Sequence, residues 1–425
     1  MTERATLSAP IYFGHRLIGT IEQLADQARL RFTYDPSWRD VAGNWPVSLS
    51  LPLSQAVHTD QRRVTARPVT NFLFGLLPDN PSTIERWARY FGVGRHDPLA
   101  LLREIGADCP GGVSFARPAD EGWEEPLDHQ QMSREMRRLQ ESLPSILEGD
   151  HGQFSLAGAQ AKTALRKTAT GWAVPHGGLP STHILKPAMT GLADQALNEH
   201  FCLELARTVG LPAAESEVVH FDDIPVLVVK RFDRVGAGRD MRRLHQEDFC
   251  QALGVHPHNK YEAESGPSLA DMMRLLDRHS GNPLADQARL YRAVFFNLII
   301  AGTDAHAKNF ALVYPPTAGA PRLAPLYDVN SFYPYATQRR DMRSSLRIAG
   351  YYKLHEITRP HLTRRIDGSR LGARDTTEIC DALLQALPDA AKTLAQTFED
   401  RGVRSNIPQA IVNGVDAACA KWRAA

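Results

Sequence analysis

The sequence has almost no net charge, which limits the partners that the chain can attract by itself. Its 49 Lys and Arg residues nearly balance its 48 Asp and Glu residues, giving a formal charge of +1 at pH 7. A chain with this balance creates no overall field that would attract nucleic acid or an acidic membrane. Any contact with DNA must therefore be local, or be provided by a partner protein.

The sequence is also poor in cysteine and in long hydrophobic runs. The five cysteines form no C-x-x-C pair and have no histidines at zinc-finger spacing, which argues for a reducing compartment and against structural zinc. The longest apolar run, AVFFNLIIA, is roughly half a membrane span, and MTERATLSAPIYF at the start contains no apolar signal core. We therefore expect a cytoplasmic protein. The cysteines are Cys109, Cys202, Cys250, Cys380 and Cys419.

The first part of the chain is predicted to contain strands followed by helices. Apolar and polar residues alternate in residues 10–23 and 28–35, which predicts short antiparallel strands, and residues 46–53 predict another. Helical spacing in residues 71–90 is interrupted at LPDNPST, where prolines stop one helix and Ser82 or Thr83 caps the next. The polar residues 116–131 are typical of an exposed connector and mark a domain boundary.

The second part begins with strands and ends with helices. Residues 154–167, 171–176 and 182–188 predict strands, and a helix follows that ends at Gly210, the expected C′ position. EVVHFDDIPVLVVKRFD predicts two further strands joined by a tight turn. Beyond Arg234 the chain is predicted to be helical apart from FALVY and RLAPLYD. With 425 residues, 43% of them hydrophobic, the chain is long enough for two or three domains.

An apolar run ends in a cluster of polar residues within FFNLIIAGTDAHAKNFALVY, residues 295–314. Asp304, His306, Lys308 and Asn309 lie within six residues, and burying such groups unpaired would cost several kcal/mol. The ordinary explanation is a helix C-terminus, in which Gly302 and the polar residues satisfy the last carbonyl groups.

A second explanation comes from the order of polar residues along the chain. Asp304 and Asn309 have the D-x-x-x-x-N spacing of the base and a metal ligand in protein kinases, and Asp328 follows two short strand-like runs. Lys186, at the end of an earlier predicted strand, stands where a kinase has its phosphate-binding lysine. A mixed sheet followed by a helical lobe predicts an α+β, bilobal protein-kinase-like fold.

The successive motifs of the chain resemble those of the HipA family, serine/threonine kinase toxins of bacterial toxin–antitoxin systems. The resemblance covers almost the whole chain and implies a HipA-like N-terminal subdomain (1–115), a kinase-like N-lobe with the nucleotide-binding loop (116–234) and a helical C-lobe with the catalytic residues (235–425). The motifs are PVSLSLPL, NFLFGLLPDN, LLREIGADCPGGVSF, FSLAGAQAKTAL, THILKP, NEHFCLELARTVGL, VVKRFDR, LHQEDFCQALG, KYEAESGP, GTDAHAKNF and YDVNSFYP.

The resemblance also implies an activity, cofactors and partners. It implies ATP-dependent protein phosphorylation with Mg²⁺, an aminoacyl-tRNA synthetase as substrate, notably the glutamyl enzyme, and inhibition by a helix-turn-helix antitoxin, HipB, in a complex that binds operator DNA. Asp304 resembles the catalytic base, Asn309 and Asp328 the metal ligands, and Lys186 the phosphate-binding lysine.

Other residues acquire candidate roles from the same resemblance. His306 shapes the loop or contacts phosphate, and Glu199 either orients Lys186 or is a solvated charge on a helix. Lys308 either screens developing charge or is solvated. Ser155 is the autophosphorylation site that inactivates the kinase. Candidates for nucleotide binding are Leu156, Ala157, Gly158, Ala159, Gln160, Ala161 and Lys162 in the loop, and the backbone of Lys230 and Phe232 at the hinge.

Two other functions are consistent with parts of this pattern. One is a catalytically silent pseudokinase that acts as a co-repressor with a DNA-binding antitoxin, although intact Asp304, Asn309 and Asp328 argue against it. The other is a metal-dependent phosphohydrolase that uses His306 with Asp304 and Asp328, although a second clustered histidine pair is lacking.

Overall fold

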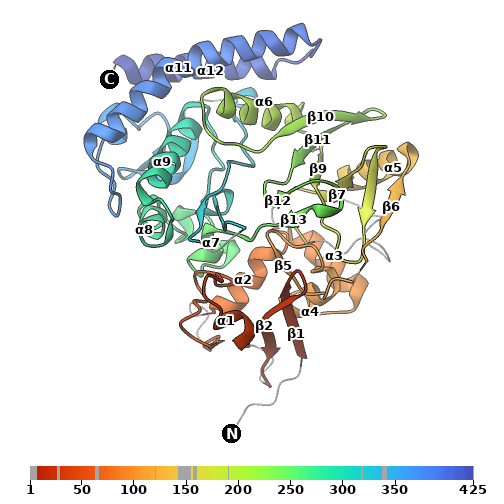
Figure 1. The fold of residues 1–425 in the computed structure, drawn as a ribbon. Coiled ribbons are helices and arrows are strands. Elements are labelled where there is room, and N and C mark those ends of the chain that lie inside the picture. Colours follow the sequence, from red (N-terminus) through yellow and green to blue (C-terminus); the bar gives the residue numbers. More distant parts are fainter. Residues whose placement is uncertain are drawn as a thin grey trace.

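Three blocks of structure meet near the centre of the molecule (Figure 1). An N-terminal block with its own sheet lies at the bottom of the view, a six-stranded sheet at the right, and a helical C-terminal block at the left and top. The computed structural model describes residues 7–25, 29–62, 67–119, 121–141, 155–156, 160–189, 191–316, 319–336 and 342–424. The predicted loop residues Ala157, Gly158 and Ala159 lie outside these ranges.

The N-terminal block is a five-stranded antiparallel sheet covered by helices. Its strands lie in the order β4-β3-β2-β1-β5, and its hydrophobic core also receives Tyr314 from the C-terminal part of the chain. The elements are β1 (Leu7–Phe13), β2 (Arg16–Gln23), β3 (Leu30–Tyr34), α1 (Pro36–Arg39), β4 (Val57–Thr59), α2 (Pro68–Leu76), α3 (Pro81–Phe91), α4 (Pro98–Ile105) and β5 (Val113–Ser114).

Two details of this block were predicted wrongly. Residues 46–53 form no strand and contain only an isolated bridge between Ser48 and Leu51, because the segment gives its polar groups to a distant residue. The Leu49 amide donates to the Glu247 carboxylate at 3.0 Å, and the Ser48 hydroxyl donates to it at 2.6 Å. Helix α3 is capped by Asn80, whose side chain accepts from the Ser82 amide at 3.0 Å, so neither Ser82 nor Thr83 is the cap.

The second block is a six-stranded antiparallel sheet with the order β10-β11-β9-β7-β8-β6. Helix α5 packs on one part of it, and a capping box at Asp128 begins that helix. The elements are β6 (Glu124–Leu127), α5 (His129–Gln140), β7 (Thr163–Lys167), β8 (Trp172–Pro175), β9 (His183–Pro187), α6 (Gln195–Thr208), β10 (Ser216–Phe221) and β11 (Ile224–Lys230).

The predicted exposed connector, residues 116–131, is therefore only partly correct. Its residues 124–127 form the edge strand β6, which pairs with β8 in the register Leu127 to Trp172. An edge strand exposes most of its side chains, so its sequence resembles a polar loop. The strand predicted at 154–167 begins only at Thr163, since residues 155–156 and 160–162 are not in a strand. The other strands of this sheet agree with the prediction, and Gly210 follows α6 with a φ of 76° as expected for C′.

The third block is mainly helical and contains several two- or three-stranded ribbons. The predicted absence of further strands is wrong for β13 and β14 and for β17 and β18. The last two are joined through Ala349 and Gly350, both with positive φ. The helices are α7 (Phe249–Ala252), α8 (Leu269–His279), α9 (Pro283–Ile299), α10 (Arg359–Leu362), α11 (Ala373–Asp400) and α12 (Ile407–Ala424). The short strands are β12 (Arg234–Val235), β13 (Arg242–Arg243), β14 (Gln246–Asp248), β15 (Ala311–Val313), β16 (Arg322–Leu323), β17 (Arg343–Ile348) and β18 (Tyr351–Lys353). Single 3₁₀ turns occur at residues 238–240, 257–259, 262–264, 307–309 and 333–335.

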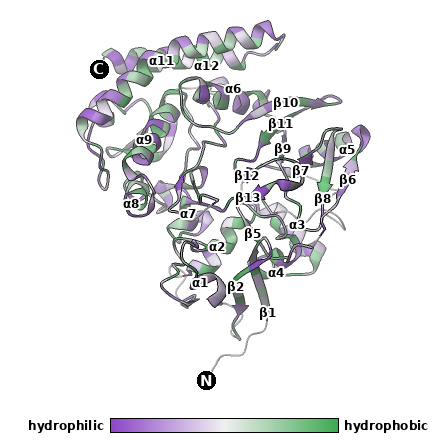
Figure 2. Cartoon of the chain, viewed as in Figure 1, coloured by the Kyte–Doolittle hydropathy of each residue, from purple (hydrophilic) through white to green (hydrophobic). Residues whose placement is uncertain are grey.

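The largest hydrophobic core joins helix α6 to the helical block. Phe201 of α6 contacts Phe398 of α11 edge to face, with ring centroids 5.3 Å apart, and Phe295 of α9 contacts Trp422 of α12. Figure 2 shows the mixed hydropathy of α11 and α12, which pack one side on this core and expose the other. Thus α6, although it lies within the predicted segment 116–234, packs against the third block as well as the sheet. None of the helices in the described ranges is both long and apolar enough to cross a membrane.

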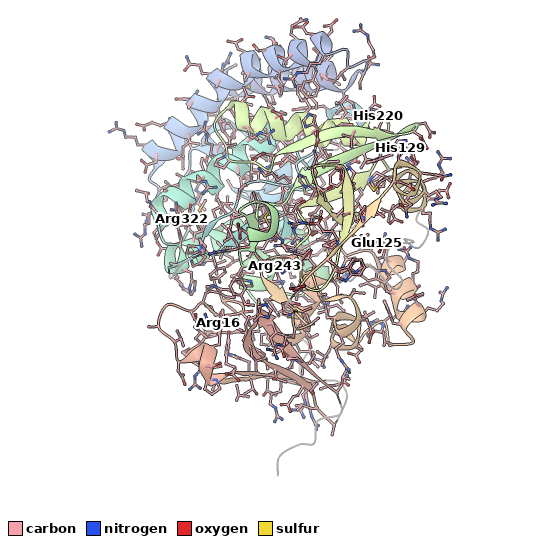
Figure 3. All side chains as sticks on the ribbon, turned by 45° about the vertical axis from the view of Figure 1, so that its right-hand side comes forward. Arg16, Glu125, His129, His220, Arg243 and Arg322 are labelled. Carbon is pink, nitrogen blue, oxygen red and sulfur yellow. The ribbon has the colours of Figure 1, made fainter. Side chains whose placement is uncertain are left out.

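A buried cluster of charges lies where the three blocks meet. The Asp108 carboxylate accepts hydrogen bonds from Arg234 at 2.8 Å and Arg243 at 3.1 Å, and from the Ser181 hydroxyl at 2.5 Å. Asp233 is bound by Arg231 at 2.8 Å and by the Gly111 amide at 2.7 Å. Figure 3 shows Arg243 at the level where the N-terminal block meets the rest of the molecule. The surrounding arginines hold the pKa values of Asp108 and Asp233 below their usual range, although burial alone would raise them.

We predict that Asp108→Asn lowers the free energy of unfolding by about 3 kcal/mol, because three buried guanidinium groups lose a shared counter-charge. A denaturant titration followed by tryptophan fluorescence measures this loss. The control is Asp223→Asn, which removes an exposed partner of Arg137 and should leave the titration unchanged. Equal midpoints for Asp108→Asn and the wild-type protein would contradict the role given to the cluster.

Candidate active site

Lys186 lies between two carboxylates that come from distant parts of the chain. Its ammonium group donates to Glu199 Oε1 on α6 and to Asp328 Oδ1 after β16, both at 2.8 Å. Lys186 is held in β9 by its register with Leu227 of β11. The structure thus brings together three residues singled out in the sequence, and Glu199 is buried beside Lys186 instead of being a solvated charge.

These contacts determine the charge state of the three groups. Burial alone would lower the pKa of Lys186, but the charges of Asp328 and Glu199 raise it above its usual value. Burial raises the pKa of Glu199, and Lys186 opposes this shift. The pKa of Asp328 is held well below its usual range by Lys186 and Lys162, against the effect of burial. At neutral pH Lys186 is therefore a cation and Asp328 an anion.

The loop that carries Asp328 is fixed on both sides. Asp328 itself has a φ of 58°, an uncommon left-handed conformation that aspartate adopts more readily than most residues. The Tyr327 hydroxyl donates to the Lys308 carbonyl at 2.7 Å, and the Ser331 amide donates to the Asn198 side chain at 2.9 Å. These hydrogen bonds hold the backbone on both sides of Asp328, and a strained residue persists only where its surroundings hold it in this way.

The polar cluster after α9 is partly a helix end, as the ordinary explanation supposes. The Gly302 amide donates to the Asn297 carbonyl at 2.7 Å, and Ala301 takes the left-handed conformation with a φ of 53°. A Cβ atom on Gly302 would lie 2.3 Å from Asn297 Oδ1, so a larger residue there would force the Asn297 side chain to move. Beyond this point the chain forms a tight loop in which the Asn309 side chain donates to the Asp304 carbonyl at 2.7 Å.

Asp304 projects from this loop and keeps most of its side chain accessible. The side chain is 64% exposed, and its Oδ1 accepts a hydrogen bond from the Tyr261 hydroxyl at 2.7 Å. Tyr261 was not predicted as a site residue, although its motif, KYEAESGP, was noted in the sequence. The contact joins residues 43 positions apart, and tyrosine carries no spacing signal that would have indicated it.

His306 and Lys308 are both buried beside the loop. Burial lowers the pKa of His306 to about 4, and the Asp304 carboxylate offsets only part of this effect, so the ring is neutral at physiological pH. The ring packs edge to face against Tyr261, with centroids 5.0 Å apart. Lys308 is buried and not solvated, and its ammonium group pairs with Asp248 at 3.0 Å and Asp79 at 3.6 Å, although the residue also lines the cavity described below. It therefore fastens the loop to α2 and α7.

These groups open onto one cavity of about 470 Å³. The cavity runs from the end of β11 to the loop after α9, and its walls come from all three blocks. Of the predicted site residues, those that line it are Leu156, Gln160, Lys162, Lys186, Glu199, Lys230, Phe232, Asp304, His306, Asn309 and Asp328. Residues that line it without having been predicted include Asp79, Ala214, Asn330 and Tyr327.

Among the described residues, predicted Ser155 and Ala161 do not line the cavity, and Lys230 lines it but has other partners. Ser155 is fully buried, and its hydroxyl donates to the Leu76 carbonyl at 2.6 Å, so it does not line the cavity. Ala161 packs against the core of the six-stranded sheet. The Lys230 amide is already used by the Glu215 carbonyl at 2.9 Å, and its ammonium group pairs with Glu215 in solvent.

The oxygen atoms around Asp328 suit a hard divalent cation. Asp328 contributes a carboxylate, and Asn309 contributes its side-chain Oδ1 because its nitrogen is bound to Asp304. Asn330 Oδ1 is buried and has no hydrogen-bond partner among the residues that the structure describes. Carboxylate and amide oxygens are ligands that Mg²⁺ prefers, and it commonly keeps several waters. The predicted metal ligands therefore fit the group implied by the sequence.

Comparisons with known proteins agree in sequence and in fold. Models of two protein families match the chain: the HipA-like C-terminal domain over residues 154–391 and the HipA N-terminal domain over residues 9–116. A Sinorhizobium fredii protein named "Putative kinase Y4mE" is 36% identical over 349 residues, which are 80% of this chain and 81% of that protein. The serine/threonine-protein kinase toxin HipA of Shewanella oneidensis is 27% identical over 421 residues, 94% of this chain and 93% of the toxin.

A solved structure confirms the predicted fold. The Shewanella oneidensis complex of HipA, HipB and operator DNA contains a chain that matches with a TM-score of 0.82 at 23% identity. The match covers 98% of this chain and 97% of that chain. The α+β, bilobal HipA-like architecture predicted from the sequence is therefore correct.

We predict that phosphate-rich ligands such as ATP bind more weakly as the pH rises through about 8. Burial lowers the pKa of Lys162 to about 8, and repulsion from Lys186 adds to this effect, so its positive charge is present below that pH and lost above it. Calorimetric titrations from about pH 7 to about pH 9.5 measure the change. Lys162→Arg should abolish the decline because a guanidinium group stays charged. The same decline in the arginine variant would contradict the assignment.

Proposed function

Because the chain belongs to the HipA family of serine/threonine kinase toxins, we propose that it transfers phosphate from ATP to a serine or threonine hydroxyl of a protein. The observation that carries this proposal is the position of Lys186, Glu199, Asp328, Asn309 and Asp304 around one cavity. Phosphoryl transfer depends on positioning and charge stabilisation, and these are the parts it requires.

Each group has a distinct task in this proposal. Asp304 receives the proton of the acceptor hydroxyl, and Tyr261 holds one carboxylate oxygen so that the other faces the acceptor. Lys186 binds nucleotide phosphates while Glu199 holds its ammonium group in place. Asp328 and Asn309 bind Mg²⁺, which neutralises charge on the phosphates. Neutral His306 supports Tyr261 without adding charge.

The hinge is proposed to bind adenine by its backbone. Lys230 and Phe232 line the cavity at the end of β11. The Lys230 amide is used within the sheet, which leaves its carbonyl oxygen and the Phe232 amide for the base. The Lys230 side chain pairs with Glu215 in solvent and therefore has no part in this proposed contact with adenine.

The biological role is proposed from the relatives. A similar protein is named a serine/threonine-protein kinase toxin, and the solved neighbour is a complex of HipA with HipB and its operator DNA. We propose that this chain is a toxin inhibited by a HipB-like helix-turn-helix antitoxin and contacts DNA only through that complex. Its proposed substrate is an aminoacyl-tRNA synthetase of the glutamyl type, so that phosphorylation blocks translation.

We predict that Asp304→Ala and Asp328→Ala each lower the rate of phosphoryl transfer at least a hundredfold, roughly 2.7 kcal/mol of transition-state stabilisation. Transfer from labelled ATP to the protein itself and to glutamyl-tRNA synthetase is the measurement. Asp416→Ala, which removes a carboxylate of α12 far from the cavity, should retain the wild-type rate.

Growth of cells that express these variants, together with the transfer measurements, distinguishes the kinase from the two alternative functions. Expression of the wild-type chain without an antitoxin should arrest growth, whereas Asp304→Ala should allow it. Transfer at the wild-type rate in either cavity variant would make the site assignment wrong, and absence of any transfer by the wild-type protein would favour the pseudokinase. Release of free phosphate without any phosphoprotein would favour the phosphohydrolase.

The proposed inactivation at Ser155 requires a large rearrangement. The hydroxyl is fully buried, donates to the Leu76 carbonyl at 2.6 Å, and its amide donates to the Asp108 carbonyl at 3.2 Å. A phosphate adds about −1.5 to −2 charges, and this charge cannot be buried where the Ser155 hydroxyl lies. Phosphorylated Ser155 must therefore leave this buried position and remain exposed to solvent. Because Leu156 lines the cavity, that movement removes part of the nucleotide site.

We predict that ATP and Mg²⁺ produce a single phosphate on Ser155 and that the modified protein binds ATP much more weakly. Mass mapping locates the phosphate, and calorimetry measures ATP binding. Ser155→Ala should block the modification while preserving ATP binding. Undiminished ATP affinity after complete modification, or a phosphate at another residue, would exclude this switch.

A further inference from the structure

The hairpin of β17 and β18 carries like charges directly opposite each other. Arg343 pairs in register with Lys353 across the two strands, and both side chains are exposed, as is Arg347 near the other end of β17. Like charges in such a pair destabilise a sheet, so folding alone gives no reason for them. Among the described residues, Arg343 contacts the ring of Tyr352 and pairs with no carboxylate.

This hairpin stands out from the charge balance of the whole chain. Its residues 343–353 include Arg343, Arg347 and Lys353 but no Asp or Glu residue, whereas the chain as a whole has a formal charge of +1. The ion pairs that the cationic side chains of the hairpin form with carboxylates are long. Arg347 lies 3.4 Å from Glu262, and Lys353 lies 3.8 Å from Glu356.

The hairpin is fastened to both sides of the candidate base. The Ser345 hydroxyl donates to the carbonyl of Thr303, the residue before Asp304, at 2.6 Å. The Arg347 amide donates to Glu262 at 2.7 Å, and the preceding residue, Tyr261, holds Asp304. A peptide whose hydroxyl group reached Asp304 would therefore pass beside the exposed cations.

We propose that the β17–β18 hairpin is a docking surface for an acidic segment of the protein substrate, next to the residue that is phosphorylated. This inference rests on the proposed kinase function and adds the chemistry of its substrate. A protein is the better partner because affinity for nucleic acid comes largely from many Lys and Arg contacts to phosphates, and this short hairpin exposes only Arg343, Arg347 and Lys353. Carboxylates form charge-assisted hydrogen bonds with arginine. These bonds would both attract the acidic segment of the substrate and hold it in a defined orientation.

Two serine peptides test the proposal directly, one flanked by glutamates and one by alanines. Binding is measured by fluorescence anisotropy, and transfer is measured with labelled ATP, so that docking and catalysis are read separately. The wild-type protein should bind and phosphorylate the acidic peptide at least tenfold more efficiently, and added salt should reduce this preference. The difference should appear in KM, with kcat nearly equal.

The charge reversal Arg343→Glu/Lys353→Glu should abolish the preference while leaving autophosphorylation and the KM for ATP unchanged. Arg374→Glu/Lys392→Glu, which reverses two exposed charges on α11, is the matched control and should retain it. Arg343→Gln/Lys353→Gln provides a milder variant in case the reversal prevents folding, and it too should weaken the preference.

Three results would overturn the docking surface. They are equal binding of both peptides by the wild-type protein, a preference that survives in the hairpin variants, or a single-stranded RNA oligonucleotide that binds the hairpin more tightly than the acidic peptide. Normal peptide binding without any transfer would instead contradict the proposed kinase function, so the two failures are distinguishable.

Discussion

The buried charge cluster around Asp108 and Asp233 is the constraint that aligns the three blocks. Removing an ion from water costs several kcal/mol, and this cost is offset only when every charge is paired and hydrogen-bonded. Arg231 and Arg234 meet both carboxylates, and these four side chains are all buried. Small displacements of the N-terminal block would break several of these bonds together. The residues after β11, which form one wall of the cavity, therefore have a fixed position relative to residues 108–111.

A second constraint acts inside the cavity, where the two carboxylates bound to Lys186 are not equivalent. Glu199 has almost no exposed surface, whereas a third of the Asp328 side chain is exposed. Asp328 can therefore exchange Lys186 for a cation or for water at lower cost than Glu199 can. The buried Lys186–Glu199 pair would keep the lysine in place if its more exposed partner, Asp328, changed ligand, which is the behaviour that the proposed nucleotide site requires.

The sequence was most informative where chemistry depends on order along the chain. Lys186, Asp304, Asn309 and Asp328 were predicted because their spacing is characteristic, and all of them line one cavity. Tyr261 was missed because its role arises from a contact with Asp304 that no periodicity indicates. The β17–β18 hairpin was missed because β18 has only three residues and its register with β17 is irregular. The segment 46–53 alternates like a strand, but Glu247, about 200 residues later, takes its polar groups.

Side chains from the N-terminal block and from the kinase-like part cross the boundary between them and form contacts on the other side. Asp79 extends from the N-terminal block to Lys260 at 2.9 Å, one residue before Tyr261, and also contacts Lys308 of the loop that carries Asp304. In the opposite direction, the Glu247 carboxylate of β14 accepts hydrogen bonds from the Ser48 hydroxyl and the Leu49 amide. Burial raises the pKa of Glu247 to about 7, so the Glu247 carboxylate in this second contact is close to gaining a proton at physiological pH. The loop that presents Asp304 is thus held by a carboxylate from the first 80 residues, and a partner protein that shifted the N-terminal block would disturb this loop without entering the cavity.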